Sequence, residues 1–248
     1  MLKVGSSIFF ITTYFSDYIL VPAKSRGQVI GALEDRGFAF EKNAEAYINP
    51  AAHRRQTSST SSLSTGSPST PPPTTVSELQ TRTFALLKRH HISPQVDVDI
   101  RLVQCAGLPG QPGKVSKDEL GLQLGIIKCL VHHPKFLSLT LTEDEPASLL
   151  LEKRLVSDFG DGRDVLVGSM EDYLKPIILD LEPLPLEATG IVCGVASKLV
   201  GRAGGHLIET IDMSYLSTAR AGTVMVNEKV LEQAMEALGV EETGAVGH

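Results

Sequence analysis

The chain contains no tryptophan, and aromatic residues make up only 5% of its 248 positions. Proteins that bind single-stranded nucleic acid stack bases on aromatic side chains, so this composition argues against that function. The formal net charge of -6 points the same way, because nucleic acids and anionic membranes attract basic surfaces. No apolar stretch approaches the roughly 18 residues that a membrane-spanning helix requires.

Cysteine is also scarce. Cys105, Cys129 and Cys193 are isolated, odd in number and form no Cys-x-x-Cys pair. This usage favours free thiols in a reducing compartment, so we expect a cytoplasmic protein without disulfides. The apolar residues 8–11 are typical of a buried strand rather than of a signal peptide, because the run is short and Asp17 soon interrupts it.

Signatures of catalysis and metal binding are missing as well. Neighbouring histidines, as in His90-His91 and His132-His133, point in different directions on a helix or a strand, so neither pair is a ready chelate. Residues 201–205 are Gly-rich but lack the Lys-Ser/Thr ending of a phosphate-binding loop, and they follow a helix. We therefore expect no metal, no cofactor and no enzyme. An enzyme of unknown type on the same scaffold stays an alternative, although no residues point to it.

What the chain does contain is a repeat at its two ends. Residues 11–21, ITTYFSDYILV, match residues 216–226, LSTARAGTVMV. Each copy ends an apolar strand, turns through small or polar residues, enters a second apolar strand and is followed by an amphipathic helix with Ala-Leu near its end. A repeated ββα unit indicates duplicated small α+β modules rather than one large enzyme core.

Composition divides the chain into five parts. Residues 57–77 are nearly all Ser, Thr, Pro and Gly, and such a stretch buries too little apolar surface to offset chain entropy. The sequence therefore predicts a partial module over 1–50, a disordered linker over 51–77, a module over 78–175, a C-terminal module over 176–240 and a flexible tail over 241–248.

Apolar periodicity and turn residues place the elements of these modules. A helix is expected over 78–90 with Ser77 as its cap, and the alternation of Val96, Val98, Ile100 and Leu102 predicts a half-buried strand over 96–105. Other helices are expected at 23–36, 117–131, 188–200 and 228–238, and other strands at 6–14, 17–21, 38–40, 136–141, 147–152, 176–181, 207–217 and 223–226. The predicted fold class is α+β, with tandem ferredoxin-like βαββαβ modules of which the first is incomplete.

Several of these segments resemble one known family. Residues 7–21, SIFFITTYFSDYILV, resemble the LSTYxTDFILV element of the CASTOR arginine sensors, which are built from ACT domains. Residues 189–192, TGIV, resemble the CGIV helix start of that family, and residues 216–218 with 224–226 resemble the IST…ALV element of its last ACT domain. The hairpin over 136–152 is similar to its third ACT domain. The resemblance implies tandem ACT modules over most of the chain.

The resemblance also implies roles for particular residues. Ser7 and Ile8 would contact an amino acid through their backbone, and Thr189, Gly190, Thr218 and Ala219 would form the facing wall of the cleft. Tyr14 and Asp17 match surface residues that bind a protein partner. The family relays amino-acid occupancy to the GATOR complex upstream of the TOR kinase, so the resemblance implies a regulatory protein in nutrient signalling.

Two positions depart from the family pattern. Ala188 and Gly222 stand where the family has acidic residues that hold the guanidinium of arginine, although a register shift of one residue would place Glu187 at the first of these positions. A guanidinium buried without an ionic partner costs free energy, so a smaller or neutral amino acid, or no ligand, fits this chain better. The alternative function is a ligand-independent protein-interaction module that uses the Tyr14 and Asp17 surface.

The family comparison further implies that the first ACT domain, and the opening strand and helix of the second, are missing before residue 6. A ββαβ remnant leaves one helix position and one strand position empty and exposes an unpaired sheet edge. Another segment such as the helix over 78–90 or the strand over 96–105, a second copy of the chain in a homodimer, or residues upstream of a misplaced start would fill these positions.

Overall fold

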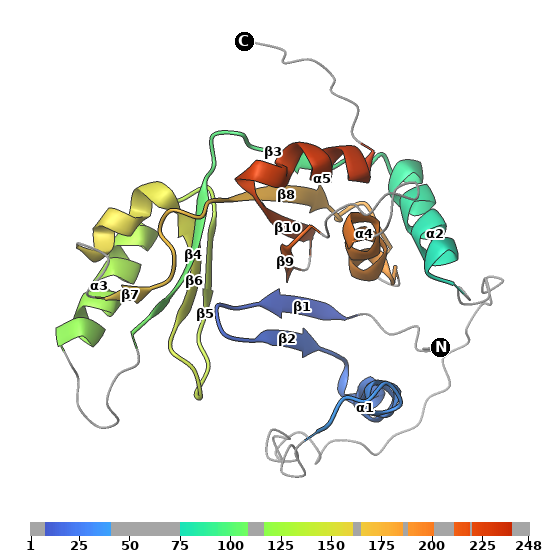
Figure 1. Ribbon diagram of the computed structural model, residues 1–248, viewed down its shortest axis with the longest axis horizontal. Coiled ribbons are helices and arrows are strands. Elements are labelled where there is room, and N and C mark those ends of the chain that lie inside the picture. Colours follow the sequence, from blue (N-terminus) through green and yellow to red (C-terminus); the bar gives the residue numbers. More distant parts are fainter. Residues whose placement is uncertain are drawn as a thin grey trace, which may run out of the picture.

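The computed structural model describes residues 8–40, 75–108, 117–160, 165–185, 188–200, 211–218 and 220–239. Within them, ten strands join in one sheet whose pairings are all antiparallel, and helices cover its faces (Figure 1). The α+β fold class built from ferredoxin-like units is thereby confirmed. The predicted tail over 241–248 and all but the last three residues of the predicted linker lie outside the described residues.

The sheet bends at its centre into two halves. Its strand order is β2 (Asp17–Leu20), β1 (Phe9–Thr12), β9 (Met213–Ser217), β10 (Ala221–Asn227), β8 (Leu174–Asp180), β4 (Leu102–Gly107), β6 (Ser148–Glu152) and β5 (Leu137–Thr140). The short strand β3 (Gln95–Val96) pairs with β8, and β7 (Leu166–Val167) pairs with β4. Only Leu102 and Leu174 connect β4 with β8, and Figure 1 shows the two halves running across each other at this corner.

The middle of the chain forms one full βαββαβ unit. Its elements are β4, α3 (Lys117–Val131), β5, β6, η4 (Lys153–Phe159) and β7, in the sheet order β7-β4-β6-β5. One apolar core lies between α3, η4 and the sheet and includes Val103, Cys105, Cys129, Leu151 and Phe159. The apolar alternation of the strands and the helical period of α3 dictate this sandwich.

The C-terminal unit has a similar sheet with an unusual fourth strand. It consists of β8, α4 (Ile191–Val200), β9, β10, η5 (Glu228–Val230) and α5 (Leu231–Leu238), and β3 takes the free edge of β8. Helix α2 (Val76–Arg89) packs against α4, where the side chain of Thr83 covers Gly194. Thus α2 and β3, which lie within the predicted 78–175 module, pack with elements of the 176–240 module.

The first unit is short. It contains β1, β2, η1 (Ala23–Ser25) and α1 (Arg26–Glu34), and none of the residues of α1 is buried. Gly37 follows with φ +90°, and the Phe38 N–H donates to the Leu33 carbonyl, so this glycine ends the helix as expected. A third core, with Leu102, Leu150 and Met225, lies between the two halves of the sheet.

Three local predictions are wrong. Helix α2 begins at Val76, and its cap is Thr75, whose hydroxyl accepts the Glu78 N–H, rather than Ser77. Residues 38–40 are not a strand. The predicted strand over 96–105 is broken into β3 and β4, and Val98 is 70% exposed. The break arises because the Asp97 carboxylate accepts the Asp99 N–H and its carbonyl accepts the Ile100 N–H, which forms a turn.

Candidate ligand site at the junction of the repeated hairpins

The two copies of the sequence repeat lie side by side in the sheet. Strand β1 pairs antiparallel with β9, and the register places Ile11 opposite Leu216. These two residues are the first positions of the two repeat copies, 11–21 and 216–226. An antiparallel pairing that places equivalent residues opposite each other makes a local two-fold axis between the copies.

Hydrogen bonds across this junction are reciprocal. The Phe10 N–H donates to the Ser217 hydroxyl at 3.1 Å, and the Tyr215 N–H donates to the Thr12 hydroxyl at 3.3 Å. Phe10 is equivalent to Tyr215 in the repeat, and Thr12 is equivalent to Ser217. The contact is therefore isologous, as in a symmetric homodimer, although both surfaces belong to one chain.

The two hairpin turns are built alike. In the first, the Thr13 N–H donates to the Ser16 carbonyl at 2.8 Å, and the Ser16 N–H donates to the Thr13 hydroxyl at 2.9 Å. In the second, Thr218 and Ala221 make the same two bonds at 2.8 and 2.9 Å. The repeated threonine thus fixes the same turn twice, because a threonine hydroxyl can hydrogen-bond its own neighbouring backbone. The predicted ββα repeat is confirmed.

Two of the predicted ligand-binding residues, Ile8 and Thr218, lie level with each other at one end of this junction. Extending the β1–β9 register places Ile8 level with the β9–β10 turn, where Thr218 is exposed. The Leu181 N–H donates to the Arg220 carbonyl at 2.6 Å, which holds the end of β8 against that turn. The chain then leads to Thr189, which is exposed before the start of α4. Ser7 and Ala219 lie outside the described residues.

Gly190 is positioned by α2 rather than by the turn. Its φ of +84° lies in the left-handed region, and an added Cβ would lie 2.8 Å from the Leu79 Cδ1. Its carbonyl accepts the Gly194 N–H at 2.8 Å, which begins the hydrogen bonding of α4. The remaining N–H groups in the first turn of a helix have no partner within the helix, so they are suited to an anionic group.

Tyr215 is a residue of this region that sequence reasoning missed. It is 2% exposed, and its hydroxyl is the one buried side-chain polar atom without a hydrogen-bond partner among the described residues. Burial raises the pKa of this phenol to about 12, so the hydroxyl stays protonated. It fills the space next to Gly222, where an added Cβ would lie closer than 3.0 Å to the hydroxyl oxygen. A buried tyrosine opposite Val224 gives no distinct sequence signal, because it reads as an ordinary core residue.

The predicted partner-binding pair lies at the other end of the first hairpin. Asp17 is exposed at the start of β2, but Tyr14 is half-buried. The Tyr14 N–H donates to the Ser148 hydroxyl at 2.8 Å, and its ring lies against Gly168. The structure therefore assigns Tyr14 to a contact inside the chain, between the β1–β2 turn and the middle unit.

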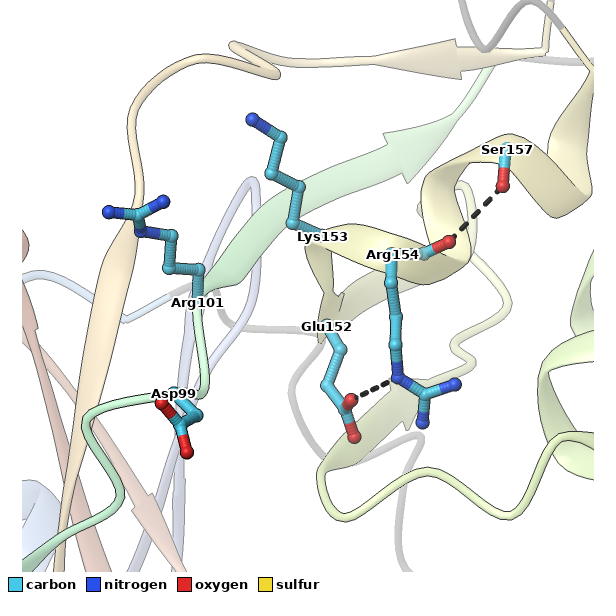
Figure 2. Close-up of a pocket in the computed structure, with 6 residues that line it drawn as sticks. All are labelled: Asp99, Arg101, Glu152, Lys153, Arg154 and Ser157. Carbon is cyan, nitrogen blue, oxygen red and sulfur yellow. Dashed lines mark hydrogen bonds and ion pairs between the residues drawn. The ribbon is translucent and has the colours of Figure 1, made fainter.

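A shallow pocket of about 460 Å³ lies elsewhere, at the start of η4 (Figure 2). Each of its three cationic side chains already has a partner within the chain. Arg101 pairs with Glu228 at 2.9 Å, Arg154 pairs with Glu152 at 2.6 Å, and Lys153 contacts Tyr173. Figure 2 shows their charged ends pointing apart rather than toward one point. Their divergence makes this pocket a poor site for a single anion.

Glu152 in this pocket is held ionised. Burial acts to raise the pKa of its carboxyl, but hydrogen bonds from Arg154 and from the Phe136 N–H outweigh burial and lower the pKa below its usual value. A carboxylate kept anionic in this way is not a proton donor, so the pocket lacks the raised carboxyl pKa that would suggest acid catalysis. In the described part of the chain, no cluster of three His, Cys, Asp or Glu side chains is placed to hold a metal ion.

Residues 3–35 match the family model of the ACT domain. This segment includes β1, β2 and all of α1, so it contains the first copy of the repeat. The match supports an ACT-domain protein. Comparison with curated protein sequences gives no match.

Three solved structures have partial similarity to this chain. A protein of unknown function from Vibrio cholerae, described as a possible transport protein, is 19% identical with a TM-score of 0.41, over 66% of this chain and 94% of its own. Aspartokinase α and β subunits are 12% identical with a TM-score of 0.39, over 59% and 94%. The aspartate kinase regulatory subunit from Thermus thermophilus is 11% identical with a TM-score of 0.38, over 59% and 95%.

None of the helices in the described ranges is long and apolar enough to cross a membrane.

Proposed function

We propose that this chain is a non-catalytic regulator that binds a free amino acid between its two repeated hairpins. The observation that carries the proposal is the reciprocal β1–β9 pairing, which aligns Ile8 with the Thr218 turn. The ACT-domain match over residues 3–35 supports it, because this resemblance implies ligand-binding regulatory modules.

The ligand is a small, uncharged amino acid. Its α-carboxylate is held by N–H groups at the start of α4, where the helix dipole favours negative charge. An uncharged side chain suits this chain because Ala188 and Gly222 occupy the positions of the family's acidic residues, and the neutral Tyr215 hydroxyl fills the space next to Gly222. Burying an unpaired cation costs several kcal/mol, which selects against arginine and lysine.

A thermal-unfolding screen of the twenty amino acids tests this function. A ligand at about a hundred times its dissociation constant adds about 2.7 kcal/mol of stability, which is readily seen as a higher melting temperature. We expect a shift with at least one small neutral amino acid and none with arginine. The proposal fails if no amino acid shifts the melting temperature at millimolar concentration.

Matched variants then locate the binding site. Thr189→Ala removes an exposed side chain at the start of α4 and should weaken binding of the ligand found in the screen. Thr142→Ala, in the β5–β6 loop of the middle unit, makes the same chemical change away from the junction and should leave binding unchanged. Equal affinities for both variants in calorimetric titration would place the ligand elsewhere.

We propose further that ligand occupancy is relayed in the cytoplasm to a protein partner such as a GATOR-type complex upstream of the TOR kinase. The CASTOR resemblance motivates this role, and Asp17 is the better probe because Tyr14 is engaged within the chain. Asp17→Ala should reduce recovery of the partner in affinity purification, whereas Asp35→Ala at the C-cap of α1 should not. Recovery that does not change with added amino acid would instead favour a ligand-independent interaction module.

A further inference from the structure

The outer face of α3 is apolar although the inner face of the same helix already packs against the sheet. Toward the sheet, Cys129 is buried, Leu122 lies over Gly107 and the ring of Phe159 lies against Gly125. On the opposite side, large apolar side chains are more than half exposed: Leu120 (60%), Leu124 (51%), Ile127 (57%), Leu130 (56%) and Val131 (66%). Figure 1 shows α3 at the periphery of the molecule, with the sheet on one side only.

The spacing of this outer stripe is that of a helix-pairing seam. Leu120, Leu124, Ile127 and Val131 follow one another at intervals of four, three and four residues. Alternating steps of three and four place side chains in a straight row that fits between the side chains of another helix, as at the a and d positions of a coiled coil. At a rise of 1.5 Å per residue, the row is about 16 Å long.

We propose that two copies of this chain associate through this stripe, with their α3 helices packed antiparallel about a two-fold axis. The interval pattern four-three-four reads the same in both directions. A two-fold axis at its midpoint therefore places Leu120 against Val131 of the other copy and Leu124 against Ile127, so every side chain of the row gains a partner.

The charges at the two ends of α3 favour the same arrangement. The first turn carries Asp118 and Glu119 after Lys117, while the last turn carries Lys128; His132, which follows, already pairs with Asp158 of its own chain. Antiparallel packing brings each acidic first turn beside the basic end of the other copy, and it opposes the two helix dipoles. Parallel packing would bring the two acidic ends together.

The exposed area is sufficient for a specific contact. The four side chains of the row and the neighbouring Leu130 together present apolar area on the order of 500 Å² in each copy, so two copies approach the roughly 1,000 Å² expected of a biological interface. This association is independent of the ligand junction, because it uses a helix of the middle unit on the far side of its sheet.

Sedimentation and light scattering of the full chain test the proposal. We expect a dimer at concentrations of about 100 µM that dissociates on dilution. The double variant Leu124→Glu/Ile127→Glu should weaken dimerisation at least a hundredfold, because it would bury four uncompensated carboxylates at one interface. Leu141→Glu is the matched control: this residue is 68% exposed outside α3, and the variant should dimerise like the parent.

Two further measurements exclude a trivial loss of folding and fix the orientation. The milder Leu124→Ala variant should retain the circular dichroism of the parent while its dissociation constant rises about tenfold. In a Cys193→Ser background, Leu124→Cys mixed with Ile127→Cys should form an intermolecular disulfide faster than either variant alone. A monomer at about 100 µM, a dimer unaffected by the double glutamate variant, or faster self-crosslinking of Leu124→Cys would overturn the proposal.

Discussion

Replacing Gly222 by alanine should destabilise the protein by a collision that the structure locates. The new Cβ would lie closer than 3.0 Å to the Tyr215 hydroxyl and 3.1 Å from the Tyr215 Cζ, and the 2%-exposed ring has little room to move. Overpacking a core by one methyl group costs about 1–3 kcal/mol. Alanine regains about 0.5–1 kcal/mol because glycine is unfavourable within a strand. The net loss is therefore about 1–2 kcal/mol, measurable as a lower urea midpoint at unchanged slope.

The second half of this experiment removes the colliding hydroxyl. Tyr215→Phe alone should be neutral or stabilising by about 1 kcal/mol, because the buried hydroxyl has no hydrogen-bond partner. In the Tyr215→Phe background, Gly222→Ala should cost much less than in the parent. The result should be the same at pH 6 and pH 9, since the pKa of Tyr215 is about 12. An equal cost of Gly222→Ala in both backgrounds would refute the collision.

Three other predictions concern packing, thiols and acid. Gly125→Ala should lower stability by about 1–2 kcal/mol, because its Cβ would lie 2.8 Å or less from atoms of the Phe159 ring. By contrast, Gly31→Ala in α1 has open space around it and should raise stability by up to about 1 kcal/mol in the same urea assay. A thiol reagent at pH 8 should modify only Cys193 in the folded protein and all three cysteines after unfolding, because burial raises the pKa of the other two thiols to about 12 and about 11. The pKa of Glu152 is lowered in the folded state, so this residue contributes stability above its unfolded pKa that is lost as the pH falls through the folded pKa. The free energy of unfolding of Glu152→Gln should therefore decrease less than that of the parent as the pH falls through this range.

The repeat and the fold class could be predicted from the sequence because both are local. Strand alternation, the threonine at each turn and the helix after each hairpin are encoded within about twenty residues of one another. The structure bears this out in detail: η1 and η5, and then α1 and α5, begin at equivalent positions of the two copies. The β1–β9 pairing, which places Ile11 opposite Leu216, was not predicted, because sequence similarity between two strands does not indicate that they pair.

The remaining features depend on contacts between distant segments. Nothing near residue 95 indicates that β3 completes the sheet of the C-terminal unit, since that edge of β8 arises about eighty residues later in the chain. The apolar alternation predicted a strand through Val98, but Asp97 forms a turn there instead. The hydrogen bond from the Asp99 N–H to the Asp97 carboxylate is local, so it is available before any sheet forms. Tyr14 was expected at the surface because the family resemblance matches it with a partner-binding residue, and its contacts within the chain, Ser148 and Gly168, are remote in sequence.

The anchoring of the β1–β2 turn gives the molecule a mechanical asymmetry. The Gln104 side chain donates to the Thr13 carbonyl at 2.8 Å, and the Ser148 hydroxyl accepts the Tyr14 N–H. Gln104 and Ser148 lie on strands whose opposite faces carry α3. Any displacement of β1 along β9 must therefore break the hydrogen bonds to Gln104 and Ser148 or move the middle unit together with β1. A displacement of the first hairpin is thus transmitted to the sheet of the middle unit, whose opposite face carries α3.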